Sequence, residues 1–414
     1  MRVLIVHQNF PGQFRRMAPV WAKRPGWDVL GIGRDTAPGL PDVRMIRYRP
    51  HRDVGAGQHH YLRRMEDAVL HGQAVARLLM KLRAKGWRPD VILAHPGWGE
   101  TLYAKDVFPD ARLIHFCEWF YNAKGADIGF DPEFPPTFDQ QVRVRTWNAL
   151  HLLNLENADV LVSPTEWQRR QHPAAYRDRI QVVHEGIDVR GLGPDPSASF
   201  TTPSGLTLRA GDPVVTYVAR NLEPYRGFHT FMRSLPRVLG ENSLAQVLVV
   251  GGDGVSYGGP PADASNWREQ MLREVGDQLD LSRVHFLGKL PYADYLRVLQ
   301  VSAAHLYLGY PFVLSWSMLE AMASGCQLVA GDTVPVREVA TERSAILVKP
   351  LDPIATAKGV LRALEERYET SRRIEARAAV SRFDAVDGLR RFTELIEMRG
   401  DEMRLSFQNA ANVD

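Results

Sequence analysis

The chain of 414 residues is too long for one hydrophobic core, so two domains of about 150 to 200 residues are expected. With 45% hydrophobic and 24% charged residues, the composition is that of a folded globular protein and excludes a disordered one. The net charge is only +3, and no basic stripe interleaved with aromatic residues is present, which argues against a nucleic-acid-binding protein.

Three further features of the sequence concern the compartment in which the protein works. No run approaches the ~18 to 20 apolar residues of a membrane span. The apolar run at the N-terminus breaks at His7, which is too early for a signal peptide. Cys117 and Cys326 give no disulfide framework, as suits a reducing compartment. We therefore expect a cytoplasmic protein.

The first half of the chain alternates short apolar, β-branched runs with helical patterns, which predicts parallel α/β structure. A long segment from about residue 59 to 85 separates the first two runs, and its apolar residues recur at helical spacing. The apolar runs of this half are 3–6, 91–94, 113–116, 160–162 and 180–183.

The second half repeats this rhythm after a break. Residues 191–212 are rich in Pro, Gly and Ser and lack periodicity, so they are expected to link two domains. This predicts an N-terminal domain, 1–190, and a second domain, 213–385, followed by a C-terminal helix and tail, 386–414. Both domains are expected to be doubly wound, Rossmann-like α/β units. The apolar runs of this half are 214–219, 247–250, 284–287, 305–308, 328–330 and 346–348.

Turns and polar side chains follow the expected strands of the first half. Gly12 lies in a turn that would let the backbone approach a ligand, or that simply needs glycine for its conformation. His95 comes just past a strand end between glycines, where a ligand site and a structural histidine are the alternatives. Glu118 and Trp119 follow the next strand. Carboxylates and aromatic faces suit a carbohydrate acceptor, although a packed loop contains the same residues.

In the second half, two arginines frame the first strand–helix turn. Arg220 ends the strand and Arg226 opens the next helix, at the sheet edge where open α/β sheets bind ligands. Arginine forms bidentate, charge-assisted hydrogen bonds with phosphate oxygens, and the alternative is a pair of solvated loop charges. A glycine turn at Gly252 follows the next strand and adds weak support for a phosphate site.

Residues 308–331 are the most informative segment of the chain. An apolar run stops at Gly309, a helix opens near Ser315 and Ser317, and a glycine ends it before the next apolar run. Such a helix start offers backbone N–H groups and a positive dipole end to a phosphate. Glu320 lies further along among apolar residues. If this carboxylate is buried it needs a partner, which ribose hydroxyls would supply, and the alternative is a salt-bridged glutamate on the surface.

The sequences LEAMASG, VARNLEPYRGF and VHFLGKLP resemble the donor-binding motifs of GT4-type glycosyltransferases, which have the GT-B fold of two Rossmann-like domains facing across a cleft. The resemblance implies that Arg220 and Arg226 clamp the donor diphosphate. GT4 enzymes have Lys where this chain has Arg226, and the spacing here is one residue longer. The resemblance also implies that Glu320 accepts the ribose hydroxyls and that Lys289 and Leu290 lie beside the nucleobase.

In GT4 enzymes the positions resembling Gly12, His95 and Gly252 lie near the diphosphate, the reacting sugar and the nucleotide, respectively. The chain departs from the family at Phe312, eight positions before Glu320, where GT4 enzymes usually carry a first glutamate that holds the transferred sugar. A phenyl ring cannot accept a conventional hydrogen bond but can pack on an apolar sugar face, so donor choice is expected to differ.

The resemblance implies a retaining glycosyltransferase that moves a sugar from a nucleotide diphosphate to a hydroxyl acceptor, such as a glycan, glycolipid or lipid-linked saccharide. No Asp-x-Asp follows a strand and no His or Cys spacing suggests a metal site, so neither a metal nor a cofactor beyond the nucleotide sugar is expected. Two other classes stay open: another GT-B enzyme, such as a nucleotide-sugar epimerase or a phosphorylase, and a non-catalytic GT-B scaffold. Basic residues on the expected first helices leave room for weak peripheral association with the inner face of a membrane.

Overall fold

The structure, a computed structural model, describes residues 1–398 and divides them into two compact units. Of these residues, unit 1 comprises 1–129, 134–186 and 385–398, and unit 2 comprises 130–133 and 187–384. The chain therefore enters unit 2 before the expected linker, 191–212, begins. The expected C-terminal helix belongs to unit 1, and the polar tail, 399–414, lies outside the described residues.

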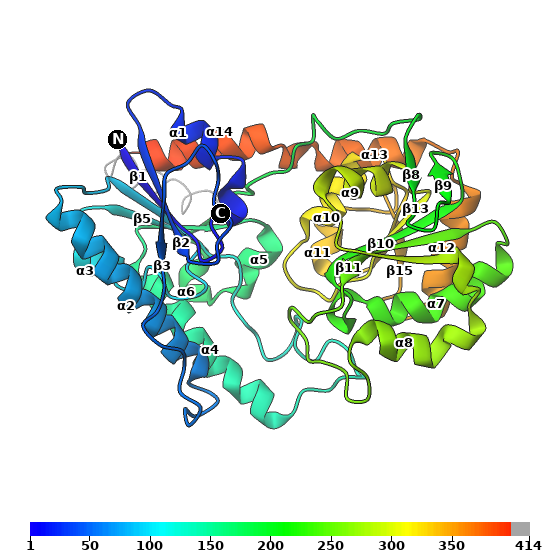
Figure 1. The fold of residues 1–414 in the computed structure, drawn as a ribbon, viewed down its shortest axis with the longest axis horizontal. Helices are drawn as coiled ribbons and strands as arrows, with labels where there is room; N and C mark the ends of the chain where they lie inside the picture. The colour runs from blue at the N-terminus through cyan, green and yellow to red at the C-terminus, as the bar shows by residue number, and fades with distance from the viewer. Residues whose placement is uncertain (399–414) are drawn as a thin grey trace. The chain divides into compact units, whose positions relative to one another are not determined.

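Unit 1 is built on a seven-stranded parallel sheet with the order β3-β2-β1-β4-β5-β6-β7 (Figure 1). Side chains of its interior strand β1 (Arg2–Val6) alternate between two buried layers, as strand geometry requires: Val3 and Ile5 join one layer, and Leu4 and Val6 join the other. The strands are β1 (Arg2–Val6), β2 (Asp28–Arg34), β3 (Met45–Tyr48), β4 (Val91–Ala94), β5 (Arg112–Phe116), β6 (Val160–Ser163) and β7 (Ile180–Val182).

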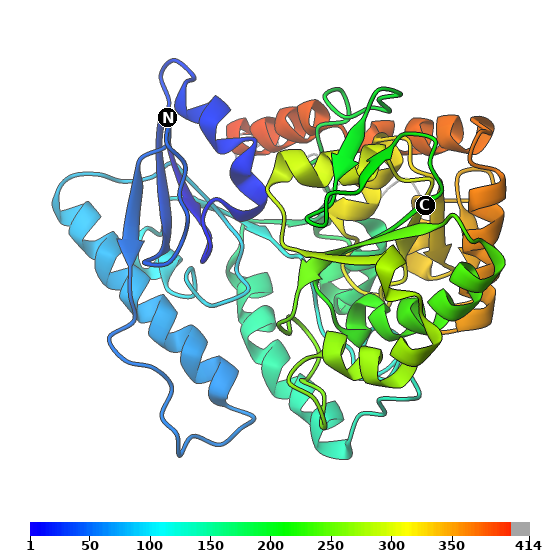
Figure 2. The same ribbon diagram turned by 45° about the vertical axis from the view of Figure 1, so that its right-hand side comes forward.

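Helices cover both faces of this sheet (Figures 1 and 2). Val75 and Leu79 of α2 pack in the layer of Leu4, whereas Phe392 of α14 packs in the layer of Val3. The long amphipathic segment is thus a helix, as expected. The helices of unit 1 are α1 (Ala18–Ala22), α2 (Arg63–Ala84), α3 (Ala104–Val107), α4 (Phe138–Asn157), α5 (Glu166–Gln171), α6 (Ala174–Arg177) and α14 (Ala385–Glu397).

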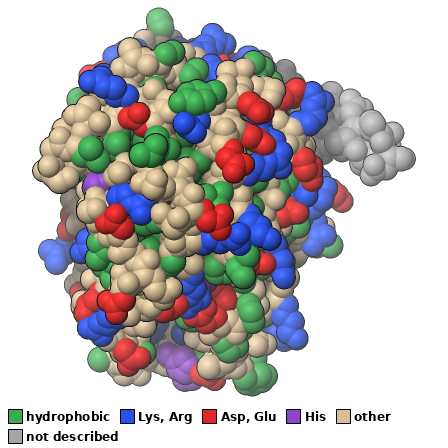
Figure 3. Space-filling view, turned by 90° about the vertical axis from the view of Figure 1, so that its right-hand side faces the viewer, with side chains coloured by type: hydrophobic (Ala, Val, Ile, Leu, Met, Phe, Trp, Pro, Cys, Tyr) green, Lys and Arg blue, Asp and Glu red, His purple; other side chains and the backbone are tan. Residues whose placement is uncertain are grey.

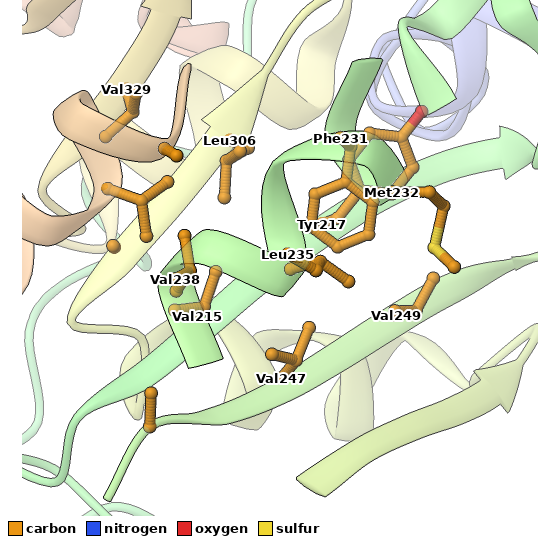
Figure 4. Close-up of a cluster of buried hydrophobic side chains, with 14 of the residues drawn as sticks. Val215, Tyr217, Phe231, Met232, Leu235, Val238, Val247, Val249, Leu306 and Val329 are labelled. Carbon is orange, nitrogen blue, oxygen red and sulfur yellow. The ribbon is translucent and has the colours of Figure 1, made fainter. Parts of the chain in front are cut away.

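Unit 2 is built on a six-stranded parallel sheet with the order β12-β11-β10-β13-β14-β15. Its core joins the central strands to helix α7, and Figure 4 shows Tyr217 and Phe231 among its side chains. The ring centres of these two residues lie 4.6 Å apart in a stacked arrangement. The strands are β10 (Val214–Asn221), β11 (Gln246–Gly252), β12 (Val284–Gly288), β13 (Ala304–Tyr307), β14 (Leu328–Gly331) and β15 (Ile346–Val348).

The segment 191–212, expected to be an irregular linker, forms a small antiparallel hairpin within unit 2. Its strands are β8 (Ser199–Thr201) and β9 (Thr207–Arg209), and Leu208 packs in one buried cluster with Val250 and Val298. The helices of unit 2 are α7 (Phe228–Glu241), α8 (Trp267–Val275), α9 (Tyr292–Gln300), α10 (Trp316–Ala323), α11 (Val334–Arg337), α12 (Pro353–Glu365) and α13 (Ser371–Val380).

The apolarity of the helices and the charge of the surface both bear on what the protein can bind. None of the helices within residues 1–398 is both long enough and apolar enough to cross a membrane. On the face drawn in Figure 3, Lys and Arg side chains are interspersed with Asp and Glu, so this face carries no large area of one sign.

Candidate active site

Helix α10 begins in the loop that follows strand β13, and a pair of serines caps its first turn. The Ser315 hydroxyl accepts a hydrogen bond from the Ser317 N–H (3.3 Å), and the two hydroxyl oxygens lie 2.9 Å apart. The Ser315 N–H donates to the hydroxyl of Tyr307 at the end of β13 (3.2 Å). The structure therefore contains the expected helix start, whose amides and dipole suit an anion.

The turn between β10 and α7 carries both arginines. Arg220 is exposed near the end of β10, and the guanidinium of Arg226 lies 4.8 Å from the centre of the Tyr257 ring. Gly227 has φ 74°, and a Cβ there would lie 2.3 Å from the carbonyl oxygen of Leu308. The turn thus needs glycine, and it passes close to the segment that leads into α10.

A buried carboxylate ties this turn to the glycine-containing loop after β11. Glu223 is fully buried and accepts hydrogen bonds from the backbone N–H groups of Ser256, Tyr257 and Gly258, the shortest at 3.0 Å. Consecutive N–H groups of this kind make an anion-binding concavity, and here a side chain of the same unit fills it. Sequence reasoning missed Glu223, although its place between the two arginines was a signal.

Two of the residues expected near the nucleotide lie together. A Cβ at Gly252 would lie 2.7 Å from Cε of Lys289, so the lysine side chain crosses directly over the glycine at the end of β11. Leu290 is half-buried and packs against the cluster that contains Val250.

Phe312 lies in an aromatic cluster that we define as Tyr225, Tyr257, Tyr310 and Phe312. Phe312 is 5% exposed, and its ring centre lies 5.4 Å from that of Tyr225 and 5.0 Å from that of Tyr257. Tyr225 in turn stacks on Tyr257 at 5.4 Å and contacts Tyr310 at 5.1 Å. The position of the family's first glutamate is therefore surrounded by aromatic rings.

Glu320 is buried, and two tyrosines of helix α9 hold its carboxylate. Tyr292 donates its hydroxyl to Oε1 (3.0 Å) and Tyr295 donates to Oε2 (2.9 Å). Burial and the neighbouring Glu320 raise the pKa of Tyr295, so its hydroxyl keeps the proton that it donates. The sequence predicted that a buried Glu320 needs partners, but it did not identify these two tyrosines.

In unit 1, the expected site residues gather at the carboxyl ends of β1, β4 and β5. Nε2 of His95 lies 3.5 Å from Oε2 of Glu118. Gly12 has φ 51°, and a Cβ there would lie 2.2 Å from the imidazole of His7, so the turn closes tightly over that ring. Burial and the nearby His95 lower the pKa of His7 to about 3, which keeps this imidazole neutral. Sequence reasoning did not place His7 in the site.

Trp119, which was also expected on the acceptor side, packs against another tryptophan. It is 5% exposed, and its ring centre is 6.3 Å from that of Trp167. Contact of Trp119 with an acceptor stays a prediction.

One group among residues 1–398 could offer three ligand atoms to a metal ion. These atoms of Asp131, Glu133 and His229 lie within 4.8 Å of one another. His229 Nε2 and the Tyr310 hydroxyl contact Asp131 Oδ2 at 2.9 and 2.5 Å, and Arg233 binds both oxygens of Glu133 at 2.5 and 2.8 Å. Because both carboxylates already receive hydrogen bonds, an ion-pair network accounts for the group without a metal. Independence from metal stays a prediction.

Two parallel-sheet, Rossmann-like units in one chain, with a capped helix start and an arginine turn at the end of a central strand, define the GT-B class. The chain matches the model of the glycosyl transferase family 4 group over residues 25–192 and that of glycosyl transferases group 1 over residues 212–366. It belongs to this GT4-type glycosyltransferase family, as its motifs predicted.

Relatives and solved structures agree with this assignment. The chain is 29% identical over 223 residues to a phosphatidyl-myo-inositol mannosyltransferase of Mycobacterium tuberculosis, covering 52% of this chain and 53% of the relative. It is 25% identical over 212 residues to a GDP-mannose-dependent monoacylated alpha-(1-6)-phosphatidylinositol monomannoside mannosyltransferase of Corynebacterium glutamicum, covering 47% and 50%. The chain spans about half the length of the curated relatives it matches.

The fold is similar to that of sucrose-phosphate synthase from Thermosynechococcus elongatus, with a TM-score of 0.70 and 18% identity over 96% of this chain and 98% of the other. It is also similar to that of HepE from Anabaena in complex with UDP and glucose, with a TM-score of 0.66 and 17% identity over 96% and 100%. The expected GT-B fold is confirmed.

Proposed function

We propose that the protein transfers a sugar from a nucleoside diphosphate to a hydroxyl group of an acceptor. The observation that carries this proposal is the position of the buried carboxylate of Glu320 on helix α10. This helix has a serine-capped start, and the segment that leads into it passes close to the turn that carries Arg226. A nucleoside diphosphate needs positive partners for its phosphates and acceptors for its ribose hydroxyls. Helix α10 offers both kinds of partner, and membership of the family supports the proposal.

In the proposed reaction, the bond between the anomeric carbon and the diphosphate oxygen breaks as the acceptor oxygen bonds to that carbon. Negative charge grows on the diphosphate and is met by Arg220, Arg226 and the amides at the start of α10. Attack from the face that the diphosphate leaves would retain the configuration and let a phosphate oxygen take the acceptor's proton. The guanidinium groups and helix dipole take the place of a metal ion.

We propose a carbohydrate or a lipid-linked saccharide as acceptor, reached at the inner face of a membrane. The names of the curated relatives, which act on phosphatidylinositol derivatives, support a lipid-linked acceptor. Basic side chains of α2 and its C-terminal end bear on this membrane association. Lys81 on α2 and Lys85 just after it are exposed, but Arg83 donates to the carbonyl of Val107, and the guanidinium of Arg64 lies 3.6 Å from the centre of the Trp147 ring. Flotation with anionic liposomes at low salt tests the association, and protein that stays wholly unbound would remove it.

The donor half of the proposal is tested by thermal-shift screening of UDP-, GDP-, ADP- and TDP-sugars, because a ligand of the folded state raises its apparent stability. Each donor that raises the melting temperature is then incubated with and without carbohydrate acceptors. Acceptor-dependent release of nucleoside diphosphate together with a new glycoside is the expected result. A donor that is epimerised in the absence of acceptor, or a protein that turns over no donor, would overturn the proposal.

A further inference from the structure

His95 and Glu118 differ sharply in what a ligand could reach. The side chain of His95 is 7% exposed, and its Nε2 is fully buried facing Glu118, whereas the side chain of Glu118 is 29% exposed. The half-buried Trp98 packs its ring 4.7 Å from His95 and 5.2 Å from His7. His95 therefore contacts both the partly exposed carboxylate of Glu118 and the partly exposed indole of Trp98.

Backbone amides fix the proton positions of both imidazoles. The Gly97 N–H donates to Nδ1 of His95 (3.2 Å), and the Asn9 N–H donates to Nδ1 of His7 (2.9 Å). Because Nδ1 of each ring accepts a hydrogen bond, the ring N–H lies at Nε2. The proton of His95 then points at Glu118, and that of His7 points at Gln13.

Gln13 links His7 to Glu118 through two hydrogen bonds, and in each bond the residue farther from Glu118 is the donor. Nε2 of His7 donates to Oε1 of Gln13 (2.8 Å), and Nε2 of Gln13 donates to Oε1 of Glu118 (2.8 Å). Oε1 of Glu118 is thus held through Gln13, and Oε2 faces the N–H of His95 at 3.5 Å. Three strand ends, of β1, β4 and β5, hold one carboxylate in place.

We propose that Glu118 and Trp98 form the subsite for a hydroxyl-bearing ring of the acceptor, in which Glu118 accepts a hydrogen bond from a ring hydroxyl and Trp98 offers an aromatic face. His95, Gln13 and His7 are positioning residues that act through Glu118. The acceptor is therefore a polyol or sugar ring rather than a simple alcohol. An aromatic face beside a carboxylate supplies the two contacts that such a ring needs, one for its apolar face and one for its hydroxyls.

The charge state of Glu118 fits this role. Burial opposes ionisation, but the hydrogen-bonding contacts with His95 and Gln13 outweigh it and lower the pKa of this carboxyl. Glu118 is consequently ionised at neutral pH and can only accept hydrogen bonds. In this proposal His95 acts through Glu118, and its expected place beside the reacting sugar stays a prediction.

This inference rests on the proposed transfer reaction, and the two can fail separately. Wild type, Glu118→Gln, Gln13→Met and the control Glu156→Gln, an exposed carboxylate of the same unit bonded to Tyr176, are assayed with the donor found by thermal shift. The acceptor probes are myo-inositol, methyl α-mannoside, octyl β-glucoside, 1-octanol and vesicles containing phosphatidylinositol. Each assay measures the new glycoside, the donor lost to hydrolysis, and the shift in melting temperature caused by nucleoside diphosphate.

Losing a hydrogen bond to a charged group should lower transfer to the ring probes about tenfold to a hundredfold in Glu118→Gln. Gln13→Met should raise the KM for the ring acceptor while the KM for the donor stays constant, a separation that a merely structural role would not produce. Both variants and the control should keep the wild-type shift with nucleoside diphosphate. The inference would be overturned by unchanged transfer in Glu118→Gln, or by transfer to 1-octanol equal to that to the ring probes. It would also be overturned if the protein consumed the donor but transferred its sugar to none of the ring probes. Failure to bind or use any sugar nucleotide would instead overturn the proposed function.

Discussion

Single side chains in unit 2 show how a buried charge is prepared for a ligand. Glu320 is nine-tenths buried on an apolar helix, yet both of its oxygens receive a tyrosine hydroxyl. Hydrogen bonds to a charged group each contribute about 1.5–3 kcal/mol, enough to offset much of the cost of burial. The tyrosines also fix the direction in which the carboxylate points, and this geometry is what recognition of a ribose would require.

Removing the hydroxyl that Tyr295 donates should therefore weaken nucleotide binding. We expect Tyr295→Phe to lower the affinity for the nucleoside diphosphate about tenfold, because one of the bonds that orient Glu320 is lost. Titration calorimetry with the ribonucleotide and its 2′,3′-dideoxy analogue measures the effect, and the variant should prefer the ribonucleotide less strongly than wild type does. Tyr176→Phe, which removes a 3.1 Å hydrogen bond to the exposed Glu156, is the matched control. An unchanged preference for ribose would argue against contact between Glu320 and the sugar.

The two arginines should matter for rate rather than for folding. We expect Arg220→Ala and Arg226→Ala each to slow transfer about a hundredfold or more, since each removes a positive partner from a growing negative charge. Steady-state kinetics with the true donor give the rate, and melting temperatures check that the fold survives. Arg237→Ala, which removes only a surface pair with Glu241, serves as control. Wild-type turnover by both variants would show that the diphosphate lies elsewhere.

Phe312 departs from the family's usual glutamate. Because its ring is buried between Tyr225 and Tyr257, a carboxylate placed there would be surrounded by aromatic faces. We expect Phe312→Glu to lose at least tenfold in activity on the native donor, and Phe312→Leu, which keeps the site apolar, to lose less. Kinetics on the purified variants decide between these outcomes. A gain of activity in Phe312→Glu would instead indicate that the native site had decayed.

At the scale of elements, the strands that sequence patterns predicted are those with continuous apolar runs. Strand β2 was missed because Gly31 and Gly33 interrupt its run, and the structure needs glycine there: a Cβ on Gly31 would lie 2.7 Å from the ring of Phe10. Strand β3 was missed because it is a partly exposed edge strand. The hairpin β8–β9 was missed because its short strands lie between turn-forming residues, which predicted only a loop.

Sequence motifs located the ends of the strands correctly but not the contacts between them. Ser315, Ser317 and Glu320 could be recognised because all three lie on one short helix. Glu223, Tyr292 and Tyr295 could not, since their partners lie on other elements and no local spacing encodes such pairs. Local periodicity determines which residues reach the sheet edge, whereas tertiary packing determines which of them meet.

The loop after β11 illustrates a contact of this tertiary kind, and it can be tested. We expect Glu223→Gln to lower the free energy of unfolding by about 1–3 kcal/mol, because a charged acceptor of backbone N–H groups is replaced by a neutral amide. Urea unfolding should show an earlier midpoint, with donor binding weakened as the loop loosens. Glu241→Gln, on the surface of α7, is the control. Equal midpoints would mean that the loop keeps its conformation without this carboxylate.

At the scale of the whole molecule, both units place their polar site residues at the carboxyl ends of central parallel strands. In unit 1 these are β1, β4 and β5, and in unit 2 they are β10 and β13. This edge is where open α/β sheets bind ligands. Doubly wound architecture thus gives each unit its own set of recognition groups. Unit 1 presents a carboxylate and an indole suited to a ring with hydroxyls, and unit 2 presents arginines and a helix start suited to phosphates.

The phosphate-binding groups proposed in unit 2 also predict how a metal chelator should affect the rate of transfer. If the arginines and the dipole of α10 carry the leaving-group charge, transfer in EDTA should proceed at close to the untreated rate. The Asp131, Glu133 and His229 group offers the alternative, because its ligand atoms lie within 4.8 Å of one another. Activity lost in EDTA and restored by magnesium or manganese would contradict the metal-free mechanism. The variant His229→Asn then locates the metal: persistence of the EDTA effect would place the ion on the diphosphate, and its disappearance would place the ion in that group.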